Sequence, residues 1–173
     1  MSNAVGKGPR VSGEWLTSKP LAKVFAAFKA ANSEVRAVGG AVRNSLIGRP
    51  VIDVDLATTA TPDAVIRLAN DAGLKVVPTG LDHGTVTLLT DRSSFEVTTL
   101  RRDVETDGRH AVVAFTTSWE EDARRRDFTI NALYCDANGT VYDPIGGLAD
   151  LRRRRVRFIG DAEARIREDY LRI

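Results

Sequence analysis

Apolar and polar positions alternate along this chain with two different periods, which predict helices and strands respectively. Between Leu16 and Ala31, apolar residues recur three and four positions apart, as on one face of an amphipathic helix. That face carries Leu21, Val24, Phe25 and Phe28. Strict alternation over 84–90 and 94–100, on either side of a polar Asp91-Arg92 turn, predicts a β-hairpin. We therefore expect an α+β fold in which a mixed or antiparallel sheet of about five strands is flanked by helices.

Capping and turn residues locate the other elements. Thr61-Pro62 pairs a capping threonine with a proline at the first helical position, and Ser118 precedes Glu121 at capping-box spacing. The predicted helices cover 16–31, 41–46, 61–71 and 161–173, and a further helix begins at 118. The predicted strands cover 34–38, 51–56, 75–78, 84–90, 94–100, 133–136, 141–143 and 156–159. The segment 101–117 is polar and irregular, and we expect a mobile loop there.

Composition indicates a soluble protein with one domain or slightly more. The chain has 173 residues, of which 43% are hydrophobic. No apolar run approaches the roughly 18 residues of a membrane span, and no signal peptide is evident. Cys135 is the only cysteine, which excludes an internal disulfide and favours a cytoplasmic location. The sequence does not indicate an oligomeric state.

The charge distribution says more than the net charge of +2, which by itself predicts no nucleic-acid partner. Arginines cluster at 101–102, 124–126 and 152–155. The guanidinium group is suited to bidentate contacts with phosphate. For the run 152–155, phosphate binding and solvated surface charge are equally good interpretations.

Asp53 and Asp55 are the most informative pair of residues. They lie in a short run that reads as a strand, where side chains two positions apart project from the same face. Two carboxylates placed so repel each other unless a cation lies between them. A hard divalent ion such as Mg²⁺ prefers oxygen ligands and is commonly held by one or two carboxylates plus substrate phosphates. The simpler alternative is a solvated strand end.

Two further features suggest nucleotide chemistry. Gly39-Gly40 followed by Arg43 forms a glycine turn, a helix start and a guanidinium, which suits an oxyanion. Glu96 is an acidic residue in the middle of a predicted strand. Such a carboxylate is rarely buried unless it is paired or binds metal, and the alternative is an edge position that faces water.

Six motifs occur in order, and together they resemble one family. They are Gly39-Gly40-Ala41-Val42-Arg43-Asn44, Asp53-Val54-Asp55-Leu56-Ala57-Thr58, Glu96-Val97-Thr98-Thr99, Arg125-Arg126-Asp127-Phe128-Thr129-Ile130-Asn131-Ala132, Asp143-Pro144-Ile145-Gly146-Gly147 and Glu168-Asp169-Tyr170-Leu171-Arg172. This series resembles the bacterial-type (class II) tRNA nucleotidyltransferase and poly(A) polymerase family of the polymerase-β superfamily. The resemblance runs from about residue 35 to the last residue, and it implies a polymerase-β-like nucleotidyltransferase fold.

The resemblance implies a role for each matched residue. Asp53 and Asp55 match the metal-binding pair of a two-Mg²⁺ site, and Glu96 matches the third carboxylate. Gly39, Gly40 and Arg43 match the triphosphate-binding turn. The family's motif for contacts with the ribose and the nucleotide is matched by Arg125, Arg126, Asp127 and Asn131. The family's pair of residues that reads the incoming base is matched by Asp169 and Arg172. Residues 143–147 match a flexible element of the family.

The resemblance also implies an activity and its limits. The expected function is addition of C, C and A to tRNA 3′ ends from CTP and ATP with release of pyrophosphate. The alternatives are a poly(A) polymerase and a non-catalytic nucleotide- or RNA-binding fragment. Residues 1–160 would form the head domain and 161–173 the first helix of a truncated neck. One departure is Asn44, where the family usually has aspartate; asparagine is a mild change if that residue mainly orients Arg43.

Overall fold

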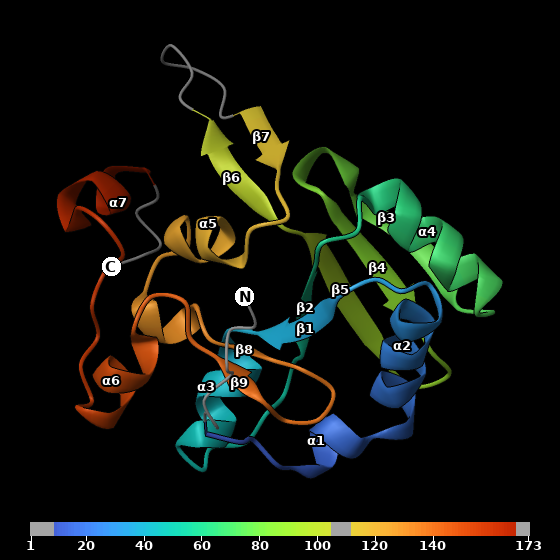
Figure 1. The fold of residues 1–173 in the computed structure, drawn as a ribbon, viewed down its shortest axis with the longest axis horizontal. Coiled ribbons are helices and arrows are strands. Elements are labelled where there is room, and N and C mark those ends of the chain that lie inside the picture. Colours follow the sequence, from blue (N-terminus) through green and yellow to red (C-terminus); the bar gives the residue numbers. More distant parts are fainter. Residues whose placement is uncertain (1–8, 105–111, 169–173) are drawn as a thin grey trace, which may run out of the picture.

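A seven-stranded mixed sheet forms the centre of the computed structural model, which describes residues 9–104 and 112–168 (Figure 1). The strand order is β3-β4-β5-β2-β1-β8-β9, and a separate two-stranded sheet contains β6 and β7. β2 and β5 pair in parallel, whereas the other neighbouring strands pair antiparallel. The strands are β1 Val35–Val38, β2 Asp55–Thr58, β3 Lys75–Gly80, β4 Thr85–Leu89, β5 Ser94–Thr99, β6 Arg101–Val104, β7 Val112–Phe115, β8 Tyr134–Cys135 and β9 Val141–Tyr142.

Helices lie on both sides of this sheet. Figure 1 shows α2 and α4 together on one side of the molecule, and α5, α6 and α7 on the other. The α-helices are α1 Glu14–Thr17, α2 Lys19–Ala30, α3 Gly40–Leu46, α4 Pro62–Asp71, α5 Trp119–Arg124, α6 Gly147–Arg152 and α7 Ala162–Glu168. Short 3₁₀ turns occur at Leu81–His83 and Thr129–Asn131. Within the described ranges, no helix is long and apolar enough to cross a membrane.

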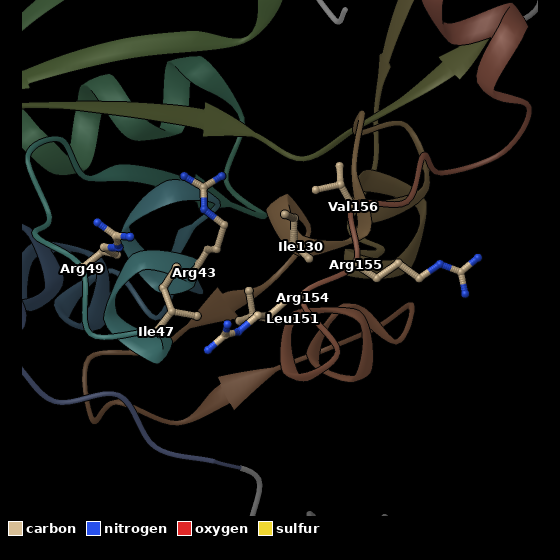
Figure 2. A pocket seen from close by; sticks show the side chains of 8 residues that line it. All are labelled: Arg43, Ile47, Arg49, Ile130, Leu151, Arg154, Arg155 and Val156. Carbon is tan, nitrogen blue, oxygen red and sulfur yellow. The ribbon is translucent and has the colours of Figure 1, made fainter.

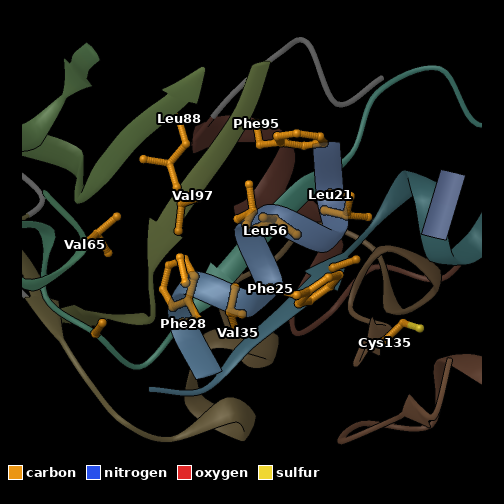
Figure 3. Packing of buried hydrophobic residues seen from close by; sticks show 14 of the residues in the cluster. Leu21, Phe25, Phe28, Val35, Leu56, Val65, Leu88, Phe95, Val97 and Cys135 are labelled. Carbon is orange, nitrogen blue, oxygen red and sulfur yellow. The ribbon is translucent and has the colours of Figure 1, made fainter. Parts of the chain in front are cut away.

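Alternation along the central strands creates two apolar layers. Leu56 faces the larger layer, where the four predicted residues of α2 are all buried (Figure 3). Its neighbour Ala57 faces a smaller layer that contains Ala123 of α5 and Tyr134 of β8. Because side chains two apart on a strand share a face, Asp55 points to the side of the smaller layer. The sheet thus directs this carboxylate toward α5.

The predicted strand 51–56 is wrong in its first half. β2 begins at Asp55, and Asp53 lies in the irregular segment that leads into it. The reason is the lack of a partner. Asp55 pairs with Val38, and the chain turns at Gly39 directly after Val38 to enter α3. No β1 residue remains to pair with the positions before Asp55.

The predicted mobile loop 101–117 is wrong at both ends. Arg101–Val104 and Val112–Phe115 pair as the antiparallel strands β6 and β7. Residues 105–111 lie outside the described residues. β6 reads Arg-Arg-Asp-Val and therefore lacks the apolar alternation that marks a half-buried strand.

Three smaller differences concern single helices and strands. The predicted helix 16–31 is divided at Ser18, whose hydroxyl accepts from the backbone N–H of Leu21 and starts α2. The predicted strand 156–159 is wrong, because only an isolated bridge joins Phe128 and Phe158 there. α6 was not predicted, since it is short and begins with glycine. The predicted hairpins and the helix that starts at Thr61 are confirmed.

Candidate active site

The three predicted carboxylates line one pocket of about 490 Å³ at the end of the sheet. Asp55 opens β2, Asp53 lies just before it, and Glu96 belongs to β5. The parallel register pairs Leu56 with Val97, so the residues one position earlier lie level with each other on the same face. All three side chains are exposed. Sheet geometry therefore gathers acidic groups that are 41 positions apart in sequence, from Asp55 to Glu96.

Electrostatics at this pocket favour a bound cation. Although Asp55 is exposed to solvent, neighbouring atoms shield part of its carboxyl group from water, and this partial burial, followed by the negative charge of Glu96, raises its pKa above the usual value. Asp53 raises it further, and the guanidinium of Arg126 opposes the change. Negative charge in the pocket is thus only partly compensated by the protein.

The donor set fits a hard divalent ion, because all three groups are carboxylates. Among residues 9–104 and 112–168, however, no three acidic, histidine or cysteine residues are gathered closely enough to hold a metal by themselves. The pocket therefore supplies part of a coordination shell. Oxygen atoms of a substrate or of water would have to complete it.

The glycine turn and Arg43 form a second part of the site. Gly39 has φ 72°, a value that favours glycine over other residues. Its N–H donates to the carbonyl of Leu133. One turn into α3, Nη1 of Arg43 donates to Oδ1 of Asn131. The amide of Asn131 donates in turn to Asp127, 3.2 Å away. The predicted nucleotide-binding residues Arg43, Asn131 and Asp127 thus form one hydrogen-bonded chain.

Asn44 orients Arg43. Its Oδ1 accepts from both Nε and Nη2 of that side chain, each at 3.1 Å. Its Nδ2 donates to the carbonyl of Pro50 at 3.0 Å. An aspartate could make the first contacts but not the last, since a carboxylate has no proton to donate.

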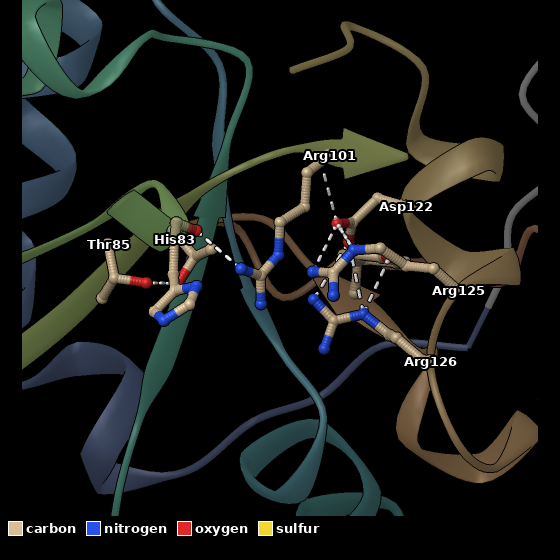
Figure 4. Close-up of polar contacts among 8 residues, drawn as sticks. His83, Thr85, Arg101, Asp122, Arg125 and Arg126 are labelled. Carbon is tan, nitrogen blue, oxygen red and sulfur yellow. Dashed lines mark hydrogen bonds and ion pairs between the residues drawn. The ribbon is translucent and has the colours of Figure 1, made fainter. Parts of the chain in front are cut away.

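A buried aspartate organises the two arginines that precede Asp127. Asp122 is 1% exposed, and its carboxylate forms ion pairs with Arg125 at 2.9 Å and Arg126 at 3.0 Å (Figure 4). It also accepts from the hydroxyl of Tyr134 at 2.8 Å and from the backbone N–H of Arg101 at 3.3 Å. The two guanidinium groups hold the pKa of Asp122 below its usual value despite burial. Asp122 of α5 therefore fixes both arginines just beyond the end of that helix, with Arg126 close enough to act on Asp55.

Asp122 and Tyr134 were missed by the sequence reasoning. One signal was available: Asp122 precedes the two arginines by three and four positions at a predicted helix, which is the spacing of side-chain pairs on one helix face. Tyr134 carried no such signal, because its contact with α5 depends on the sheet.

The remaining predicted residues divide into two groups. Asp143 accepts from the backbone N–H groups of Gly147 and Leu148 and thereby caps α6. Asp169 and Arg172 lie outside the described residues. The base-reading role assigned to that pair is left as a prediction.

A separate cleft of about 520 Å³ starts at Arg43 and runs toward the end of α6 (Figure 2). We call it the arginine cleft. It is lined by Arg43, Ile47, Arg49, Ile130, Leu151, Arg154, Arg155 and Val156. Ile130 belongs to the same segment as Asp127 and Asn131, so the cleft adjoins the hydrogen-bonded chain described above.

Comparison with known proteins agrees with this geometry. Residues 35–157 match the family model described as the poly A polymerase head domain. The chain is 52% identical over 141 residues to a mitochondrial CCA tRNA nucleotidyltransferase 1 of Danio rerio, covering 81% of this chain and 33% of that protein. It is 46% identical over 138 residues to a CCA-adding enzyme of Geobacillus thermodenitrificans, covering 79% and 33%. The chain thus spans about a third of the length of these relatives.

Solved structures share the fold. The Bacillus stearothermophilus CCA-adding enzyme in complex with CTP aligns with a TM-score of 0.75 at 42% identity, over 92% of this chain and 36% of that one. A tRNA nucleotidyltransferase complexed with a primer tRNA and an incoming ATP analog aligns with a TM-score of 0.65 at 32% identity, over 86% and 42%. The predicted polymerase-β-like fold is confirmed, with seven strands in the main sheet of the described residues instead of about five. The chain belongs to the poly A polymerase head domain family.

Proposed function

We propose that this chain is the catalytic head of an enzyme that adds C, C and A to the 3′ ends of tRNA from CTP and ATP, releasing pyrophosphate. The observation that carries the proposal is the pocket in which Asp53, Asp55 and Glu96 meet beside Arg126. Relatives named as CCA-adding enzymes support the choice of reaction. In this proposal residues 1–160 are the head, and 161–173 begin the neck.

Asp53 and Asp55 would hold Mg²⁺, with Glu96 as the third carboxylate. When bound, the metal supplies activation of the RNA 3′-hydroxyl and neutralisation of charge on the triphosphate. The raised pKa of Asp55 supports this assignment, because a divalent cation would offset the repulsion that Asp55 experiences from Glu96 and Asp53. The carboxylates would hold the ion next to the start of β2, at the end of the sheet.

The basic residues would bind the nucleotide. Gly39 and Gly40 would place the start of α3 next to the phosphates, and Arg43 would provide the guanidinium. Arg125, Arg126, Asp127 and Asn131 would contact the ribose and the nucleotide. The polar network supports these roles, since Asp122 fixes both arginines and Asn131 links Asp127 to Arg43. Asp169 and Arg172 would read the base, because a carboxylate and a guanidinium offer paired acceptors and donors.

Incorporation of labelled nucleotides tests the proposal. The protein would be incubated with MgCl₂, labelled CTP or ATP, and tRNA that lacks its last three nucleotides. Ordered addition of C, C and A is the expected result. Long tails of A alone would instead show a poly(A) polymerase. Binding of tRNA and CTP without any incorporation, in the protein as produced from its own gene, would contradict both enzymatic functions.

Location is a separate question. A cytoplasmic enzyme is our proposal, although the relative from Danio rerio is named as mitochondrial. Cell fractionation with an antibody to this chain would distinguish the two compartments.

A further inference from the structure

The arginine cleft is lined by four arginines and by no acidic residue among its described lining residues. Arg43 and Arg49 come from the region of α3, whereas Arg154 and Arg155 follow α6. Ile130 and Leu151 add apolar surface between them. Figure 2 shows Arg154 directed toward Ile47, while the guanidinium of Arg155 lies farther out. Such a surface is complementary to a chain of phosphate groups whose bases can rest their flat faces on apolar side chains.

The backbone at Arg154 is unusual. Its φ is +54°, and the other described residues in this left-handed range of φ are seven glycines and Asn32. The N–H of Arg154 bonds to the carbonyl of Leu151, and the N–H of Arg155 to that of Asp150. These two bonds form a Schellman motif at the end of α6, in which the position of Arg154 is usually occupied by glycine.

A glycine at position 154 would end α6 with less backbone strain than arginine does. The arginine therefore offers no advantage to the backbone, and its contribution must come from its side chain. That side chain lines the cleft, whereas Arg153, its neighbour in the same basic run, does not. The structure therefore separates two arginines that are equivalent in the sequence. The run 152–155 is not uniform surface charge.

We propose that the arginine cleft binds phosphodiester groups of single-stranded RNA next to the reacting 3′ end, with Arg154 as a direct phosphate contact. This inference rests on the proposed function, because it needs an RNA strand at the site. A triphosphate already has Arg43 and the glycine turn. Arginines spread over two elements suit successive phosphates of a chain better than one compact group.

A matched pair of variants tests this assignment. Arg154→Asn and Arg153→Asn each remove one charge from the same run, and asparagine tolerates the left-handed backbone of position 154. Binding would be measured by fluorescence anisotropy with a labelled single-stranded RNA of the tRNA 3′ sequence, over a range of salt concentrations. We expect Arg154→Asn to weaken binding about 3- to 10-fold and to lower the salt slope by about 0.7. Arg153→Asn should change the affinity less than about twofold.

Two further measurements separate the alternatives. CTP binding should be the same in Arg154→Asn and in the unmodified protein, and the melting temperature of Arg154→Asn should be equal or higher because strain is relieved. Equal weakening by both variants would show diffuse charge and overturn the inference. Loss of CTP affinity with intact RNA affinity would make the cleft a triphosphate site and would also overturn it.

Failure of this inference can be distinguished from failure of the proposed function. If the protein adds C, C and A but the two variants bind RNA alike, the function stands and the phosphate contact is wrong. If the protein adds no nucleotide, yet Arg154→Asn alone loses RNA affinity, the contact stands and the reaction is wrong.

Discussion

At the level of single residues, Asp55 links the stability of the protein to the chemistry of its pocket. Its raised pKa means that the folded protein holds the proton of Asp55 more tightly than the unfolded chain does. Ionised Asp55 therefore destabilises the fold. That penalty is complete above the folded-state pKa and vanishes below the ordinary value of 3.8.

Asp55→Asn should consequently raise the melting temperature at pH 7 in EDTA, by about 1–2 °C given the exposure of the side chain. The difference should be largely lost near pH 3, below the ordinary value of 3.8, because Asp55 is then mostly protonated in both the folded and the unfolded protein. Thermal unfolding at the two pH values provides the test. Added MgCl₂ should then stabilise the unmodified protein more than the variant. A variant that is less stable at pH 7 would show that Asp55 is already well compensated.

Asn44 provides a prediction about orientation. Asn44→Asp keeps the oxygen that accepts from Arg43 and loses only the exposed bond to the carbonyl of Pro50. We expect kcat/KM for CTP to change less than about threefold, equivalent to under about 0.7 kcal/mol. Steady-state incorporation measures it. A change of tenfold or more would show that the charge at position 44 matters, beyond the alignment of Arg43.

At the level of elements, α5 depends on a buried ion network. Asp122→Asn leaves two guanidinium groups without their carboxylate and should cost about 3 kcal/mol or more. Tyr134→Phe removes a single hydrogen bond to Asp122 and should cost about 1 kcal/mol. Urea unfolding of both variants measures these free energies. If Asp122→Asn cost less than Tyr134→Phe, the carboxylate would not be the centre of the network.

The sequence predicted those elements whose signals are local. The apolar face of α2, the threonine that begins α4 and the Asn138-Gly139 hairpin all depend on residues a few positions apart. It failed where pairing decides the structure. β6 is a polar strand that is recognisable only through its pairing with the apolar β7. Asp53 was placed in a strand because its neighbours are β-branched, although β1 ends too early to pair with it.

The candidate site was predictable to a similar degree. Its charged residues stand out in motifs. Asp55 and Glu96 lie level with each other because of the register in which β2 and β5 pair. The residues that support them do not stand out. Tyr134 and the left-handed Arg154 have roles set by burial and backbone geometry, which no spacing rule encodes, whereas Asp122 shows only its helical spacing to two arginines.

At the level of the whole molecule, the chain combines the fold of the poly A polymerase head domain family with a pocket lined by three carboxylates, within about a third of the length of its relatives. The residues that line this pocket come from separate parts of the sequence, around Ser18, Asp53 and Glu96. The central claim is that Asp53 and Asp55 are needed for nucleotide transfer and not for folding.

The most direct test is incorporation of a single labelled CMP into tRNA that lacks its last three nucleotides. The unmodified protein, Asp53→Asn, Asp55→Asn and the exposed α4 control Asp71→Asn would be compared after circular dichroism has shown that all are folded. We predict at least a 100-fold loss of rate in the two pocket variants, equivalent to about 2.7 kcal/mol in the barrier, and a rate within twofold of normal in the control. Near-normal transfer by folded Asp53→Asn or Asp55→Asn would contradict the account.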